Sequence, residues 1–97
     1  MVIITFTKIR KYALENTNAK IALLHWNNVV SKADWSCLAD VKKEFPNVDY
    51  VGDDRYVFNV KGNKYRIVVM IHFNIRTLYV KFIGTHAEYD KIDAREI

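Results

Sequence analysis

The segment RYVFNVKGNKYRIVVMIHF, residues 55–73, constrains the fold of this chain more than any other stretch. Two runs rich in β-branched and aromatic residues flank Gly62-Asn63, and short Gly/Asn pairs are typical of tight hairpin turns. Such a turn would set Asn59 opposite Arg66. A third run of this kind, TLYVKFI, residues 77–83, follows after NIR. We therefore expect an antiparallel meander in the second half of the chain.

Side chains alternate between the two faces of a strand, so the register also predicts which residues share a face. One face is expected to be apolar or aromatic and to carry the helices: Tyr56, Phe58, Val60, Tyr65, Ile67, Val69, Ile71, Phe73, Leu78, Val80 and Phe82. The other face collects Arg55, Asn59, Lys61, Lys64, Arg66, His72, Tyr79 and Lys81, with Val57, Val68 and Met70 between them. This pattern predicts a cationic, concave and open sheet face.

The first half of the chain reads as one strand and three helices. VIITF is a short β-branched strand, and KIRKYALEN after Thr7 is expected to be helical. A second helix should run from Ala19 to about Lys32, and SCLADVKKEF should form a third, with Ser36 as a possible cap and Pro46 closing it. The predicted fold is α+β, a single domain over residues 1–97 in which N-terminal helices pack on one face of a twisted, mainly antiparallel β-sheet.

Bulk properties narrow the function classes. The chain has 97 residues and a formal net charge of +4, which favours anionic partners and nucleic acid above all. A lone Cys37 fits a reducing cytoplasm. The apolar runs are far shorter than the roughly 20 residues of a membrane span, and charges interrupt the N-terminal stretch where a signal peptide needs its apolar centre. A cytoplasmic protein without a membrane partner is expected.

Behind the last predicted strand, the stretch GTHAEYDKIDA, residues 84–94, gathers several titratable groups. Pairing Phe73 with Leu78 would place residues 84–86 beside Tyr65 and Arg66. Thr85 and Glu88 fit a capping box for a terminal helix. That role leaves His86 unexplained, and a histidine is suited to moving protons near neutral pH. Tyr89, three residues on, would lie on the same side of the helix as His86 or pack on the core.

Arg66 stands mid-strand on the predicted open face. It is either a salt-bridged surface arginine or a phosphate clamp, because a guanidinium matches two phosphate oxygens. The lysines on that face usually serve solubility, and only their grouping favours RNA binding. HAE also matches half of a zinc deaminase signature. The cysteine pair of that signature is missing, so we expect no metal and no cofactor.

The segments ADWSCLADVKKEFP, DRYVFNVKGNKYRIVV and YVKFIGTHAEYDKIDA together resemble the HigB branch of the RelE-like toxins, from the first strand to the terminal helix. These are the toxin halves of bacterial type II toxin–antitoxin pairs. The resemblance implies cleavage of mRNA, usually on translating ribosomes. It also implies neutralisation by a helix-turn-helix antitoxin of the HigA type.

The resemblance also implies roles for particular residues. RelE-like toxins place an arginine in the strand that reads KYRIVV here, which matches Arg66, and a tyrosine on or near the terminal helix, which Tyr89 resembles. Where some relatives have an arginine just past the last strand, this chain has Thr85-His86, so proton transfer falls to His86. The expected chemistry is attack by the ribose 2′-OH, assisted by Arg66, His86 and Tyr89. Five further residues are expected to bind RNA: Asn59, Lys61, Lys64, Tyr79 and Lys81.

Two other classes remain open from the sequence. The basic face could belong to a non-catalytic module that binds RNA or the ribosome, with bases stacked on Tyr79 or Tyr89. It could also serve only a protein partner in an inert structural domain.

Overall fold

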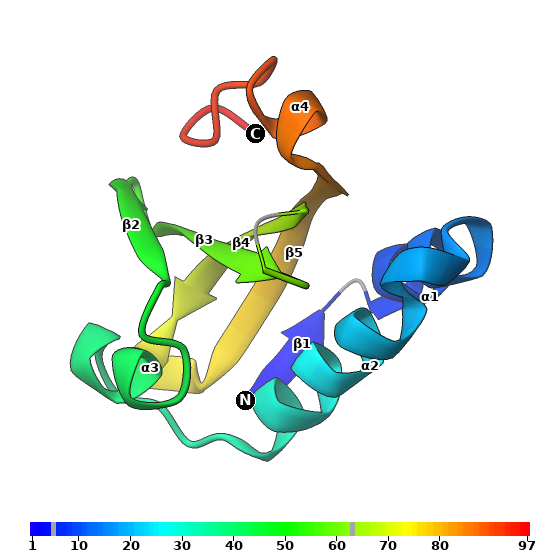
Figure 1. Ribbon diagram of the computed structural model, residues 1–97. Helices are drawn as coiled ribbons and strands as arrows, with labels where there is room; N and C mark the ends of the chain where they lie inside the picture. Colours follow the sequence, from blue (N-terminus) through cyan, green and yellow to red (C-terminus); the bar gives the residue numbers. More distant parts are fainter. Residues whose placement is uncertain (5, 63) are drawn as a thin grey trace.

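The computed structural model describes residues 1–4, 6–62 and 64–97, and it confirms the α+β class. Its elements follow the order β1 (Val2–Ile4), α1 (Phe6–Glu15), α2 (Thr17–Lys32), α3 (Leu38–Glu44), β2 (Asp49–Gly52), β3 (Arg55–Val60), β4 (Tyr65–His72), a 3-10 turn (Phe73–Ile75), β5 (Thr77–Thr85) and α4 (His86–Tyr89). In the described residues, five strands form one sheet in the order β1-β5-β4-β3-β2, in which β1 and β5 run parallel and the other neighbouring strands run antiparallel. Figure 1 shows α1 and α2 lying together as a pair of helices, with α4 and the C-terminal segment at the far end of the sheet.

The central hairpin has the predicted register. Asn59 pairs with Arg66, and Val60 pairs with Tyr65. The turn residue Asn63 lies outside the described residues, as does Thr5 at the end of the predicted first strand. Gly62 adopts a φ of +66°, a conformation that glycine reaches without a steric penalty.

The helices cover the apolar face as expected. Trp26 of α2 and Trp35 before α3 are almost fully buried, and both rings contact Phe58 of β3. Leu23 and Val30 complete the inner face of α2 over Ile67 of β4. Burial of these side chains is the main force holding the helices on the sheet.

The local structure differs from the expectation at α3 and at β2. The N-cap of α3 is Cys37 rather than Ser36, whose hydroxyl donates to the Asp40 carboxylate at 2.8 Å. The strand β2 was not predicted from the sequence. A turn with positive φ at Gly52, Asp53 and Asp54 joins β2 to β3. Polar residues in that turn obscured a strand of only four residues, which lies at the sheet edge.

The predicted pairing of Phe73 with Leu78 is also wrong, because Leu78 pairs with Ile71. The register then changes between Val68 and Val69, which pair with Phe82 and Val80. Lys81 is thus the extra residue of a β-bulge, and bulges re-aim the side chains that follow them. Phe82 leaves the helix-covered face and packs with Val57 and Val68 on the other side of the sheet.

That second face is consequently not open along its whole length. Ile92, Ala94 and Ile97 of the C-terminal segment pack over Val57 and Val68, which are 4% and 0% exposed. Arg55 is held there as well, because its guanidinium donates to the main-chain oxygen of Ile97 at 2.6 and 3.1 Å. Apolar side chains on the supposedly solvated face required this cover. The end of the face near α4 keeps a polar pocket.

Candidate active site

The site is assembled where β4 and β5 meet α4. Arg66 pairs with Gly84 and Tyr65 pairs with Thr85, so His86 follows directly beside the start of β4. The His86 amide donates to the main-chain oxygen of Lys64 at 3.0 Å. The bulge reduces the error of the predicted register from two residues to one, so residues 84 and 85 lie beside Arg66 and Tyr65 as expected.

A capping box fixes the first turn of α4. The Thr85 hydroxyl accepts from the Glu88 amide at 3.2 Å, and the Glu88 carboxylate accepts from the Thr85 amide at 2.8 Å. The predicted structural role of these two residues is confirmed. The box leaves His86 and Tyr89 of α4 available for chemistry.

Arg66 and His86 are in direct contact. Nη2 of Arg66 lies 2.6 Å from Nδ1 of His86, and Nε2 of His86 lies 3.2 Å from a carboxylate oxygen of Asp90. A guanidinium can only donate, so the contact requires Nδ1 to carry a lone pair. The neutral imidazole then holds its proton on Nε2, directed at Asp90. The nitrogen of His86 that can accept a proton is therefore Nδ1, the one that Arg66 contacts.

Arg66 is only 9% exposed, although it lies on the face away from α1 and α2. Its guanidinium carbon lies 6.0 Å from the centre of the Tyr89 ring, which is a cation–π distance. Burial raises the pKa of the Tyr89 phenol above its ordinary value, and the Asp49 carboxylate raises it further, while Arg66 acts in the opposite direction. Tyr89 is therefore a proton donor at neutral pH.

A pocket of about 390 Å³ opens beside these side chains. Arg66, Tyr89, Asn59 and Val57 form one wall, and Pro46, Asn47, Val48 and Asp49 of the α3–β2 connection form the other. A cavity of this volume lies at the lower end of the range of small-molecule sites. Arg66 supplies the cation there, and Asn59 supplies an amide.

The structure thus gathers four of the expected residues in one place: Arg66, His86, Tyr89 and Asn59. The main-chain oxygen of Lys64 accepts a hydrogen bond from the His86 amide, and the Lys64 side chain is exposed. Sequence reasoning missed Asp90 and the α3–β2 connection. Asp90 lies four residues after His86, a helical spacing that could have indicated the contact. The connection carries no comparable signal, since only the tertiary fold brings it to Arg66.

The other expected RNA contacts lie elsewhere. Lys61 has a φ of +53° and turns to the helix side, where its ammonium donates to the main-chain oxygen of Asn18 at 2.7 Å. Tyr79 is on the predicted face but pairs with Met70, four residues along β4 from Arg66, which is roughly 13 Å. Its ring contacts His72. Lys81, in the bulge, lines a groove between β5 and α1.

Within the described parts of the chain, no group of three or more His, Cys, Asp and Glu residues is arranged to hold a metal ion. Those same parts contain no helix long and apolar enough to cross a membrane.

Known proteins resemble this chain over most of its length. Residues 19–92 match the HigB toxin family, described as the RelE-like toxic component of a toxin–antitoxin system. The mRNA interferase toxin HigB of Escherichia coli K12 is 33% identical over 93 residues, covering 93% of this chain and 88% of that protein. The mRNA interferase HigB of Shigella flexneri has the same identity and coverage. The mRNA interferase HigB of Escherichia coli O6:H1 is 33% identical over 94 residues, covering 95% of this chain and 91% of that protein.

Proposed function

This chain belongs to the HigB family of RelE-like toxins, and from that premise we propose that it cleaves mRNA by metal-independent attack of the ribose 2′-OH. The observation that carries the proposal is the 2.6 Å contact between Arg66 and His86 beside the Tyr89 phenol. These three side chains supply a phosphate-binding cation, a proton acceptor and a proton donor. Such a set is sufficient for transesterification at phosphorus.

The division of labour follows from the protonation states. His86 accepts the 2′ proton, and the resulting imidazolium is stabilised by Asp90. The 2′ oxygen attacks phosphorus as the bond to the 5′ oxygen breaks, giving a 2′,3′-cyclic phosphate. Tyr89 donates its proton to the departing 5′ oxygen. Arg66 balances the charge that builds on the phosphorane, and Asn59 contacts the neighbouring nucleotide.

In the absence of substrate Arg66 contacts Nδ1 of His86, so substrate must change this contact. A phosphate that binds the guanidinium draws it toward the anion and exposes the Nδ1 lone pair. The base is then released only when a phosphate is in place. Asp90 keeps the imidazole oriented while this exchange occurs.

The decisive test compares RNA substrates with a single deoxyribose. Deoxyribose on the 5′ side of the scissile phosphate should abolish cleavage there and leave binding nearly unchanged, since phosphate contacts persist. The matched control places the deoxyribose one nucleotide further along, where cleavage should continue. Addition of a chelator should not inhibit. Cleavage of the first deoxy substrate, or loss of activity with the chelator, would contradict the mechanism. A non-catalytic RNA-binding module would bind all of these substrates and cleave none.

We further propose that the substrate is mRNA on translating ribosomes in the cytoplasm, and that the antitoxin is a helix-turn-helix protein of the HigA type. The family description supports an antitoxin partner, and the net charge of +4 supports a polyanionic substrate. Induced expression should arrest growth and produce transcript cleavage in the translated regions. Co-expression of a neighbouring helix-turn-helix gene should restore growth and co-purify with this chain. Cleavage confined to untranslated RNA, or a failure to rescue, would count against these assignments.

A further inference from the structure

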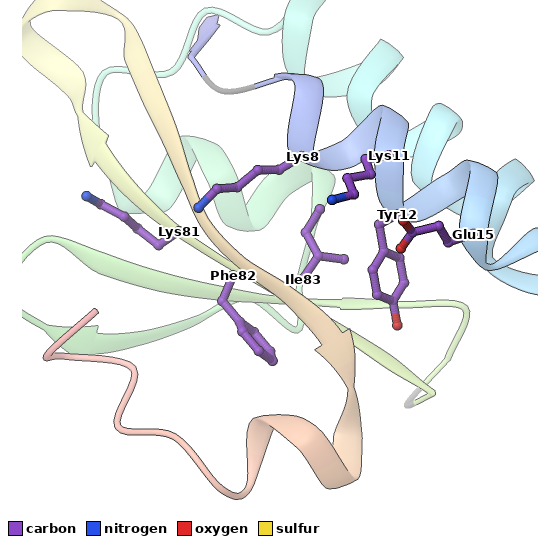
Figure 2. A pocket seen from close by; sticks show the side chains of 7 residues that line it. All are labelled: Lys8, Lys11, Tyr12, Glu15, Lys81, Phe82 and Ile83. Atoms are coloured by element: carbon purple, nitrogen blue, oxygen red, sulfur yellow. The ribbon is translucent and has the colours of Figure 1, made fainter.

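A basic groove of about 340 Å³ lies between α1 and β5, away from the pocket of Arg66. Lys8 and Lys11 contribute from successive turns of α1, and Lys81 contributes from the β5 bulge, against one acidic residue, Glu15. Figure 2 shows Lys8 and Lys11 extending from α1 toward β5. The groove thus presents three ammonium groups above a strand.

The groove continues toward the catalytic corner. Tyr12 stands in its wall, and the Tyr12 ring contacts the Tyr65 ring at 6.2 Å, edge to face. Tyr65 pairs with Thr85, the residue that begins α4. The pKa of Tyr12 is raised by burial and next by the Glu88 carboxylate, so α4 adjoins this end of the groove. Along β5, Ile83 precedes His86 by three residues, roughly 10 Å.

The edge of β5 at this point carries no neighbouring strand among the residues that the structure describes. β1 pairs with β5 only from Thr77 to Tyr79, whereas the groove is lined by residues 81–83. A chain can therefore lie in the groove without displacing part of the sheet.

We propose that the α1–β5 groove binds the backbone of the single-stranded RNA where it continues beyond the scissile phosphate. Lys8, Lys11 and Lys81 contact consecutive phosphates, and the partly exposed Tyr12 ring packs against a base. This inference rests on the proposed ribonuclease function and assigns α1 a role in substrate affinity rather than chemistry. The excess of lysines over carboxylates favours a polyanion over a protein segment as the occupant.

The test uses the double variant Lys8→Gln/Lys11→Gln, because neither lysine belongs to the catalytic pocket. Binding is measured by fluorescence anisotropy at several salt concentrations, using RNAs of about 4 and about 16 nucleotides with deoxyribose at the cleavage site. For the long RNA the slope of log affinity against log salt should fall by about 1.4, since each lost phosphate contact in a single strand contributes about 0.7. The short RNA should bind the variant and the unaltered protein with the same affinity.

The matched control is Lys32→Gln/Lys42→Gln, which removes the same charge from exposed sites on α2 and α3. It should leave both slopes unchanged. An equal loss of slope in the control would show that net charge alone determines the affinity, and it would contradict RNA binding in the groove. An unchanged slope in the Lys8/Lys11 variant would also overturn it, as would equal losses for long and short RNA.

Two further outcomes separate other occupants and the proposed function. If the Lys8/Lys11 variant loses affinity only for the antitoxin or only for vacant ribosomes, the groove serves that partner and the proposal is wrong. If all-ribose RNA is bound through the groove but never cleaved by the unaltered protein, the ribonuclease function fails while the groove stands. The anisotropy and cleavage measurements are independent, so the two failures are distinguishable.

Discussion

At the scale of single residues, Arg66 combines properties that are hard to reconcile with a purely structural arginine. It is almost buried, yet its guanidinium contacts a histidine nitrogen and an aromatic ring beside a polar pocket. Desolvation strengthens the interaction of such a cation with a phosphate. Burial thus equips Arg66 to act at a transition state.

Arg66→Ala should lower the cleavage rate by more than about 10²-fold, the scale of losing one transition-state donor. Arg66→Lys should recover part of this loss, because an ammonium keeps the charge but not the bidentate geometry. Single-turnover cleavage with excess protein measures the effect, and circular dichroism checks that the variants fold. A folded Arg66→Ala protein with nearly full activity would remove Arg66 from the mechanism.

Asp90 acts through His86, as a positioning residue. Asp90→Asn should reduce kcat about 10- to 100-fold, the range expected for losing a charged hydrogen bond of 1.5–3 kcal/mol. KM should stay constant, because Asp90 contacts His86 and does not line the pocket that is proposed to hold the substrate. A purely structural Asp90 would lower stability and leave the kcat of the folded protein unchanged. His86→Ala provides the reference, with an expected loss of about 10²–10⁴-fold.

Tyr89 gives a prediction in alkali. Its folded-state pKa is raised above the ordinary 10.0, mainly by burial and then by Asp49. The protonated phenol is thus favoured by folding, and its contribution to stability is complete below pH 10 and lost as the pH rises through the folded pKa. Ultraviolet difference titration should show one phenol fewer in the high-pH group for Tyr89→Phe. The free energy of unfolding of the Tyr89→Phe variant should also fall less at alkaline pH than that of the unaltered protein. Identical titrations would contradict the burial of this phenol.

At the scale of elements, the sequence predicted the hairpin, the helix-covered face and the capping box correctly, because each depends on neighbours in the chain or on strict alternation. It failed at Phe82. One extra residue in β5, Lys81, reverses the alternation, and nothing local distinguishes a bulged strand from a regular one. Lys61 was misplaced for a similar reason, since its left-handed backbone ends the alternation before the turn.

Gly84 shows how closely the redirected Phe82 is fitted. A Cβ at Gly84 would lie 2.5 Å from the Phe82 ring and 3.2 Å from the Glu88 carboxylate. Gly84→Ala should therefore destabilise the fold by about 1–3 kcal/mol, a typical penalty of overpacking. Urea denaturation measures this change. Gly84→Ala/Phe82→Leu should recover part of the loss by removing the ring, and no recovery would mean that the strain lies elsewhere.

At the scale of the whole molecule, the chain builds two apolar layers on its sheet. The larger lies under the helices, and the smaller lies under the C-terminal segment. The sequence showed Val57 and Val68 on the second face, but it gave no indication of what would cover them. The cover consists of residues without regular secondary structure, whose position depends on tertiary contacts. The same cover leaves the end of the face near α4 uncovered, and the proposed function assigns the substrate to that end.

Ala94 is the test of that cover. It is 7% exposed and packs against Val57 and Val68, so an aspartate there would bury an unpaired charge. Ala94→Asp should lower the free energy of unfolding by about 3 kcal/mol or more, if the segment stays in place. If the segment detaches instead, the loss is smaller, Tyr89 becomes solvated and cleavage falls with it. Ala87→Asp is the control, since Ala87 is exposed in the first turn of α4, where an acidic residue is tolerated. Equal stability of both variants, with full cleavage by Ala94→Asp, would show that the segment contributes nothing to the site.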